Sequence, residues 1–322
     1  MKVREFAKTA LGLHEWVPDL CVGECALPEA AVTTGLARLT PQEARSRGAR
    51  SLVIGVANRG GILEPAWVPT LIHALEAGLE LVSGMHGRLS AHPELKAAAE
   101  RLGRRLIDVR EPPPGIPIAT GAKRSGKRLL TVGTDCALGK KYTALTLARE
   151  FGRRGVNADF RATGQTGILI AGAGIPIDAV VADFVAGAAE ILSPDASEDH
   201  WDVVEGQGSV FHPSYAGVSL GLLHGTQPDV IVLCHEVGRD KILGLDDYPT
   251  PRLEEAIDLH LKLARRTNPH VRCAGVSLNT SRLSGGQAFA VMSALATGLH
   301  LPVADPLRPG TQLDRLVESC LA

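Results

Sequence analysis

The chain has 322 residues, of which 45% are hydrophobic and 21% charged, and its formal net charge is −1. This length and composition are those of a globular protein with room for two cores. The near-neutral charge and an aromatic content of 4% argue against a protein that binds nucleic acid or an anionic membrane.

The first residues and the cysteines point to the cytoplasm. Residues 1–6 lack the apolar core of a signal peptide, and no apolar run approaches the length of a membrane span. Cys21 and Cys25 are the only close pair among six cysteines, and nothing downstream completes a zinc pattern. We therefore expect reduced thiols and no bound metal.

The N-terminal part of the sequence alternates strands with helices. A capped helix is predicted over 40–48. Thr40 would be the N-cap, Pro41 the first helical residue, and Glu43, three residues after the cap, would complete a capping box. A strand at 51–57, a helix at about 64–75 and a strand at 79–82 then predict a βαβ unit of Rossmann type. A helix at 92–102 and a strand at 105–109 follow.

This unit lacks the details of a dinucleotide site. Its glycines, Gly55, Gly60 and Gly61, do not follow the G-x-G-x-x-G spacing. His86 stands near the end of the second strand, in Ser83-Gly-Met-His86, where an acidic residue would meet a ribose. We expect a structural unit, or one that offers Arg59 and His86 to an anionic ligand, rather than a nicotinamide site.

A change in composition predicts a linker. Proline-rich residues 111–117 and the Gly- and Lys-containing stretch 121–127 separate the two halves. We place the boundary near residue 125, which gives a Rossmann-like domain over 1–125 and a second domain over 126–322. The basic residues at 123–128 are expected to be solvated.

The second domain begins with a predicted phosphate-binding loop. Residues 129–132 form an apolar strand, residues 133–139 a glycine-bounded loop, and Lys140 opens a helix. Backbone N–H groups of such a loop converge on an anion, to which the lysine adds charge. The residues expected to hold a phosphate ligand are Gly133, Thr134, Asp135, Cys136, Ala137, Leu138, Gly139, Lys140, Lys141 and Thr143.

The loop departs from the standard G-x-x-x-x-G-K-[ST] spacing. Five residues separate Gly133 from Gly139. Lys141 stands where a Mg²⁺-binding hydroxyl is usual, and Thr143 is the next hydroxyl. Phosphate binding is therefore better supported than metal-dependent nucleotide hydrolysis.

Strands continue to alternate with helical segments to the end of the chain. Strands are expected at 158–162, 202–204, 229–236, 273–280 and 301–306, which predicts an α/β protein with a largely parallel sheet. Read as one helix, 177–187 would place Asp178 and Asp183 on different faces. The mostly polar residues 193–202 are expected to be exposed.

Polar residues collect at the predicted carboxyl ends of these strands, where open α/β sheets bind ligands. We select four as candidate catalytic residues, because each could act as a general base: His212, Glu205, His235 and Glu236. The residues selected as candidate substrate ligands are Arg59, His86, Thr163, Gln165, Thr166, Asp183 and Gln207.

Several longer motifs resemble the D-glutamate N-acetyltransferase family. They are Gly133-Thr-Asp-Cys-Ala-Leu-Gly-Lys140, Ala162-Thr-Gly-Gln-Thr-Gly-Ile168, Asp183-Phe-Val-Ala-Gly187, Glu205-Gly-Gln-Gly-Ser209 and Leu222-Leu-His-Gly225. Ser83-Gly-Met-His86 and Asp305-Pro-Leu-Arg308 also fit. The resemblance implies a Rossmann-like N-terminal half, a P-loop NTPase-like C-terminal half, and acetyl transfer from acetyl-CoA to the amine of D-glutamate in D-glutamate catabolism.

The loop is also similar to that of dethiobiotin synthetase, Gly-Thr-Asp-x-x-x-Gly-Lys-Thr, with Lys141 in place of the final threonine. Val204-Glu-Gly-Gln-Gly208 resembles that enzyme's Val-Glu-Gly-x-Gly, whose carboxylate serves a Mg²⁺–nucleotide site. This second resemblance keeps an ATP-dependent ligase or kinase open as an alternative. A non-catalytic nucleotide-binding module is a third class.

The missing hydroxyl at position 141 favours the acyltransferase. Coenzyme A carries a pyrophosphate and a 3′-phosphate, and acetyl transfer needs no Mg²⁺ on a γ-phosphate. We therefore expect acetyl-CoA as co-substrate rather than ATP with Mg²⁺, an amino acid as the acceptor, and a homo-oligomer. As general base, His212 or Glu205 is ranked ahead of His235 and Glu236.

Overall fold

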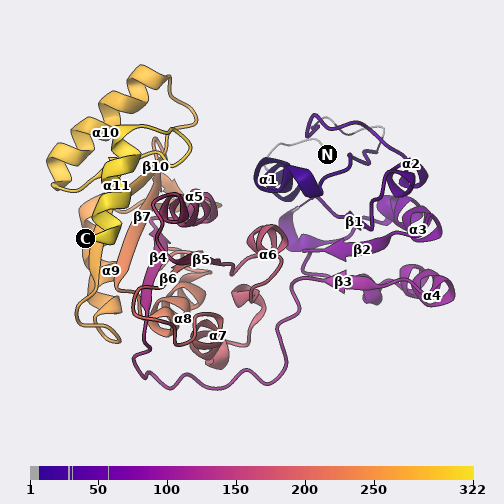
Figure 1. The fold of residues 1–322 in the computed structure, drawn as a ribbon, viewed down its shortest axis with the longest axis horizontal. Helices are drawn as coiled ribbons and strands as arrows, with labels where there is room; N and C mark the ends of the chain where they lie inside the picture. The colour runs from indigo at the N-terminus through magenta and orange to yellow at the C-terminus, as the bar shows by residue number, and fades with distance from the viewer. Residues whose placement is uncertain (1–6, 28–29, 31, 57) are drawn as a thin grey trace. The chain divides into compact units, whose positions relative to one another are not determined.

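A computed structural model describes residues 7–27, 30, 32–56 and 58–322, and divides the chain into two compact units. The first unit comprises residues 1–112 together with 165–172, and the second comprises residues 113–164 and 173–322. Figure 1 follows the chain through both units, which are described separately here.

The N-terminal unit is built on a three-stranded parallel sheet in the order β1 (Ser51–Val53), β2 (Glu80–Ser83) and β3 (Leu106–Asp108). Helices α3 (Val68–Glu76) and α4 (Pro93–Leu102) form the two crossovers, which confirms the predicted βαβ arrangement. Helix α1 (Lys8–Trp16) precedes them, and α2 (Pro41–Ser46) carries the predicted capping box between Thr40 and Glu43.

Helix α6 (Gln165–Ala171) belongs to this N-terminal unit although it lies far along the chain. It packs on α1, and the buried hydroxyls of Thr9 and Thr166 are hydrogen-bonded at 3.1 Å. The sequence analysis predicted no helix between the strand at 158–162 and residue 177, so this helix is a feature that it missed.

The C-terminal unit contains a six-stranded parallel sheet (Figure 1). Its strands lie in the order β11 (Val303–Ala304), β10 (Arg272–Asn279), β7 (Val230–Glu236), β4 (Lys127–Gly133), β6 (Trp201–Val204) and β5 (Ala158–Arg161). The helices are α5 (Lys140–Arg153), α7 (Val185–Leu192), α8 (Ala216–Thr226), α9 (Leu253–Ala264), α10 (Gly285–Leu299) and α11 (Thr311–Leu321). A separate antiparallel hairpin pairs β8 (Lys241–Ile242) with β9 (Leu245–Pro249).

Both faces of this sheet are covered, as its continuous apolar strands predict. Leu129 packs with residues of α5 and α11, whereas its neighbour Leu130 packs with residues of α7, α8 and α9 on the other face. The first strand of the unit, β4, lies between β7 and β6, so the connection after β4 falls where the strand order reverses. Open α/β sheets bind their ligands at this position.

Three interpretations of the sequence differ from the structure of the C-terminal unit. Residues 177–187 are not one helix, because two short 3-10 turns, Ile177–Ala179 and Ala182–Phe184, precede α7. The segment 193–202 is not uniformly exposed, since both of its ends are buried. The basic residues at 123–128 are not all solvated, because Arg124 and Arg128 are buried.

The buried Arg124 binds backbone carbonyl groups at the C-terminal ends of two helices, where such groups lack intrahelical partners. Arg124 donates to Ala189 O, Glu190 O and Ser193 O at or just past the end of α7. It also donates to Gly225 O and Thr226 O at the end of α8. A basic cluster that resembled a linker is therefore part of the packing of the C-terminal unit.

Within the part of the chain that the structure describes, no helix combines the length and the apolarity that crossing a membrane would require.

Candidate functional site

The loop between β4 and α5 encloses the amino group of Lys140. The side chain is only 6% exposed, and its Nζ donates to Asp135 O at 2.8 Å. Burial lowers the pKa of Lys140 from its ordinary value. Gly139, with φ of 111°, provides the left-handed turn that leads into α5.

The loop lysine retains hydrogen-bonding capacity. Among the residues that the structure describes, Asp135 O is the one recorded acceptor for Lys140 Nζ, while an ammonium carries three N–H donors. A buried donor without an acceptor is energetically unfavourable, so an anion on the loop would satisfy the remaining donors. The residues present therefore fit a phosphate group.

The backbone after β6 packs directly against this loop. A Cβ on Gly206 would lie 1.7 Å from Thr131 O and 3.0 Å from Lys140 Cδ. Gly206 N also donates to Thr131 Oγ1 at 2.9 Å. Only glycine permits this approach, which brings the backbone just after Glu205 against β4 and the side chain of Lys140.

Glu205 is buried, with 4% of its surface exposed, and only one of its two carboxylate oxygens accepts hydrogen bonds from described residues. Its Oε2 accepts hydrogen bonds from Thr163 N at 3.0 Å and Gly164 N at 3.1 Å. No bond to Oε1 is recorded among the described residues. Burial raises the pKa of Glu205, and the charge of Lys141 and the two N–H groups oppose this rise. A carboxyl group with a raised pKa is suited to proton transfer near neutral pH.

Thr163 and Gln207 support the same carboxyl group. Thr163 Oγ1 donates to Glu205 O at 2.7 Å, and Gln207 Nε2 donates to Thr163 Oγ1 at 3.1 Å. Gln207 also lies over Gly164, where an added Cβ would be 2.4 Å from Nε2. These two residues therefore order the surroundings of Glu205.

Both ring nitrogens of His212 have backbone partners. Nδ1 accepts from Ser214 N at 3.1 Å, and Nε2 lies 3.3 Å from Leu243 O. Because Nδ1 is an acceptor, the proton is assigned to Nε2, which then donates to the carbonyl group. His212 is therefore better placed to hold Leu243, in the connection between β8 and β9, than to take a proton from substrate.

His235 and Glu236 end β7 and are engaged with neighbouring groups. His235 Nδ1 pairs with Thr134 Oγ1 at 2.9 Å, and burial lowers the pKa of His235. Glu236 forms ion pairs with Arg239 and, at 3.3 Å, with Arg282. Arg239 was not selected from the sequence, and its only local signal is its position three residues after Glu236.

The two other candidate phosphate ligands on α5, Thr143 and Lys141, have different surroundings. Thr143 is 1% exposed, and its hydroxyl is bonded to Ser277 Oγ at 2.8 Å and Gly139 O at 3.2 Å. The hydroxyl of Thr143 is therefore buried and bonded within the protein. Lys141 Nζ lies 4.3 Å from the ring centroid of Tyr142.

One cluster beside the loop has the residue types of a metal site. Ligand atoms of Asp135, Cys136 and His212 lie within 4.8 Å of one another. However, Asp135 Oδ1 accepts from Cys136 N, and Oδ2 accepts from Leu243 N and Arg239 Nη1. With His212 also engaged through both nitrogens, this donor set does not suit a resident cation.

Other predicted substrate ligands belong to other elements of the chain. His86, Gln165 and Thr166 belong to the N-terminal unit, where Gln165 packs on Gly84 at the end of β2. The side chain of Arg59 lies outside the described residues. Asp183, in the C-terminal unit, lies in an exposed 3-10 turn before α7.

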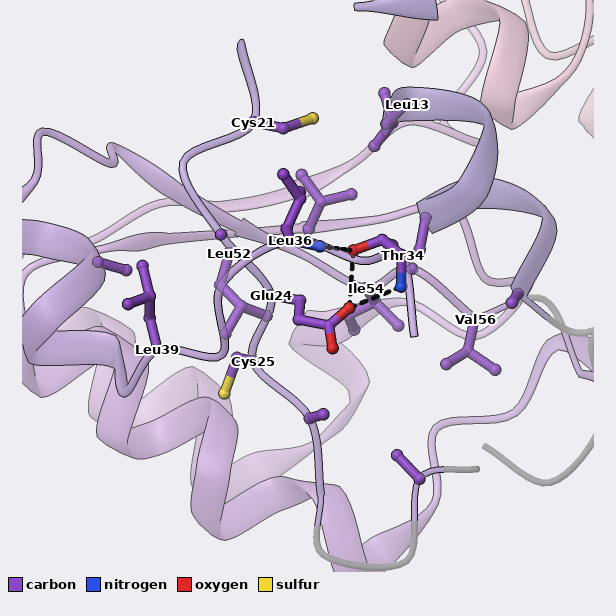
Figure 2. Close-up of a pocket in the computed structure, with 18 of the residues that line it drawn as sticks. Leu13, Cys21, Glu24, Cys25, Thr34, Leu36, Leu39, Leu52, Ile54 and Val56 are labelled. Carbon is purple, nitrogen blue, oxygen red and sulfur yellow. Dashed lines mark hydrogen bonds between the residues drawn. The ribbon is translucent and has the colours of Figure 1, made fainter. Parts of the chain in front are cut away.

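The N-terminal unit also contains a large cavity of about 950 Å³, shown in Figure 2. Side chains such as Leu13, Leu52 and Ile54 make its lining mainly apolar. Its labelled carboxylate, Glu24, is bound by the backbone N–H and the hydroxyl of Thr34, both at 2.7 Å. The described residues that line the cavity include Glu24 and Glu64 but no lysine or arginine, which does not favour a phosphate ligand there.

A parallel sheet with a glycine loop at the reversal of strand order and a buried lysine at the start of the next helix defines a P-loop domain. The chain belongs to the DUF1611 family: residues 117–317 match its P-loop domain of unknown function, and residues 23–112 match its Rossmann-like domain.

Relatives cover nearly the whole chain. A D-glutamate N-acetyltransferase of Tritonibacter scottomollicae is 50% identical over 98% of this chain and 94% of its own length. One of Pseudoalteromonas sp. is 46% identical over 94% of this chain and 91% of its own. A crystal structure of a DUF1611 family protein from Anabaena variabilis is 32% identical, with a TM-score of 0.87, covering 98% of this chain and 95% of that one.

Proposed function

We propose that the protein is an N-acetyltransferase that moves an acetyl group from acetyl-CoA to the amine of D-glutamate. The two relatives that bear this name are 50% and 46% identical to it over nearly their full lengths. The structural observation that carries the proposal is a buried loop lysine with unused donors, together with a buried carboxyl group of raised pKa at the end of the neighbouring strand β6. The lysine would bind the phosphate groups of the acyl donor, and the carboxyl group would take a proton from the amine of the acceptor.

The loop would hold phosphate groups of coenzyme A. Lys140 and the backbone N–H groups at the start of α5 supply donors and positive charge. The position after the lysine, Lys141, carries no hydroxyl, and the hydroxyl of Thr143 is bonded to Ser277. The usual hydroxyl ligand for Mg²⁺ is thus absent from this place, which favours a donor that reacts without metal.

We assign the general base to Glu205. The amine of glutamate is protonated at neutral pH and must lose a proton before its nitrogen attacks the thioester carbonyl. In that transfer a C–N bond forms and the C–S bond breaks. The ammonium loses two protons in all: one is released to solvent before attack, and the other passes through Glu205 to the departing thiolate. Glu205 has its Oε1 available, whereas the other three candidate groups are held by backbone, hydroxyl or arginine partners.

Metal independence tests the reaction class. We expect purified protein with acetyl-CoA and D-glutamate to release free thiol and form N-acetyl-D-glutamate in the presence of EDTA at an undiminished rate. The measurement is a thiol assay with mass-spectrometric identification of the product, and L-glutamate is the matched acceptor control. A product that appears only with ATP and Mg²⁺ would identify a ligase of the dethiobiotin-synthetase type instead.

Removal of the loop lysine tests the donor site. We expect Lys140→Ala to weaken binding of coenzyme A by about 1.5–3 kcal/mol, the value of a hydrogen bond to a charged group. Calorimetry measures the affinity directly, and Lys123→Ala, which removes a lysine that pairs with Asp229, is the control. Unchanged affinity in a folded Lys140→Ala variant would remove phosphate binding from this loop.

A further inference from the structure

The buried carboxylate of Asp135 connects the phosphate loop to the segment that follows β7. The residue is fully buried, and its Oδ2 accepts from Arg239 Nη1 at 2.9 Å and from Leu243 N at 2.8 Å. A buried charge is stable only when it is paired and hydrogen-bonded. Among the described residues, Arg239 is the one ion-pair partner of Asp135.

The backbone of the same residue holds the loop lysine. Asp135 O accepts from Lys140 Nζ, and the next carbonyl group, Cys136 O, accepts from Arg239 Nη1 at 3.0 Å. Arg239 therefore binds the segment that orients the ammonium group of Lys140, through the carboxylate of Asp135 and the backbone carbonyl of Cys136. No hydrogen bond or ion pair between Arg239 and either Lys140 or Glu205 is recorded in the described structure.

Arg239 is itself fixed by the end of β7. Its Nη2 donates to Glu236 Oε2, and the side chain of Arg239 is 16% exposed. Glu236 has a second partner in Arg282, whose side chain is 73% exposed. Through Glu236, Arg239 thus connects the end of β7 to the phosphate loop.

Building on the proposed function, we propose that Arg239 is a positioning residue for the acyl donor, acting through Asp135 and Cys136 on the loop that presents Lys140. Loss of the guanidinium would release the Asp135 segment and misplace the ammonium relative to the phosphate groups of coenzyme A. Among the described residues, the proposed base, Glu205, is bonded to Thr163 and Gly164 and takes no part in these contacts. The effect should therefore fall on the donor alone.

The test compares donor and acceptor constants in matched variants. Arg239→Gln should raise the KM for acetyl-CoA and the Kd for coenzyme A about tenfold, within the range for residues that share one hydrogen-bond network. The KM for D-glutamate should stay within about twofold, because no contact of Arg239 reaches Glu205. Arg239→Lys should recover part of the donor affinity, and Arg282→Gln, which removes the other partner of Glu236, should change neither constant.

Two outcomes would overturn the assignment. One is an unchanged Kd for coenzyme A in folded Arg239→Gln protein, and the other is an equal loss for donor and acceptor, which indicates general damage. Calorimetry with coenzyme A needs no turnover, so it decides the role of Arg239 even if the wild-type protein fails to acetylate D-glutamate. Such a failure would reject the proposed function instead.

Discussion

Glu205→Gln is expected to lower kcat about 10²–10⁴-fold, the usual contribution of a general base, while the Kd for coenzyme A stays unchanged. The amide oxygen of glutamine can still accept from Thr163 N and Gly164 N, so the variant removes the proton acceptor and keeps the local structure. Steady-state kinetics and calorimetry measure the two quantities.

The pH profile gives the same assignment an independent test. A base acts only when deprotonated, and burial raises the pKa of Glu205 above its ordinary value. Activity should therefore fall as pH decreases through this raised pKa, at a higher pH than for an exposed glutamate. The matched variant His212→Asn should keep that acid limb. If Glu205→Gln works within a few-fold of wild type, the base lies elsewhere.

The second large effect is on stability, at Arg124. Replacement by alanine should destabilise the protein by about 3–5 kcal/mol, because each buried carbonyl group left without its donor costs about 1–3 kcal/mol. The reason is that carbonyl groups at the ends of α7 and α8 lose their donor while still buried. Urea unfolding followed by circular dichroism measures the change.

The neighbouring lysine supplies the control for this stability experiment. Lys123→Ala removes an exposed ion pair with Asp229, a kind of contact that contributes about 0–1 kcal/mol. If the two variants unfold at the same urea concentration, the carbonyl contacts of Arg124 do not stabilise the fold. Arg124→Lys should fall between them, because one ammonium cannot reach the carbonyls of both helices at once.

The features that were predicted from the sequence are those encoded by neighbouring residues. Apolar residues 129–132, the glycines and Lys140 specify a strand, a loop and a helix within one short stretch, and the structure has that arrangement. The alternation of strands and helices likewise predicted both parallel sheets. In each case the relevant interactions are local, so their spacing can be read directly.

The features that were missed depend on partners far along the chain. Arg124 resembles a solvated linker residue until the ends of α7 and α8 bring their carbonyl groups to it. Helix α6 follows a strand of the second unit in the chain, yet it packs on α1 of the N-terminal unit. Arg239 is bound by the carboxylate of Asp135, which lies more than a hundred residues earlier in the chain. No periodicity or motif reports such pairings.

Helix α6 has a consequence for how the protein is made. The N-terminal unit needs residues 165–172, which are synthesised only after β4, α5 and β5 of the following unit. On the ribosome this unit therefore stays incomplete, with α1 lacking its helical neighbour and Thr9 its hydroxyl partner, while the next unit is already emerging. The contact between α1 and α6 can thus form only after part of the second unit has been synthesised, and a cut at the linker would separate the two helices into different fragments.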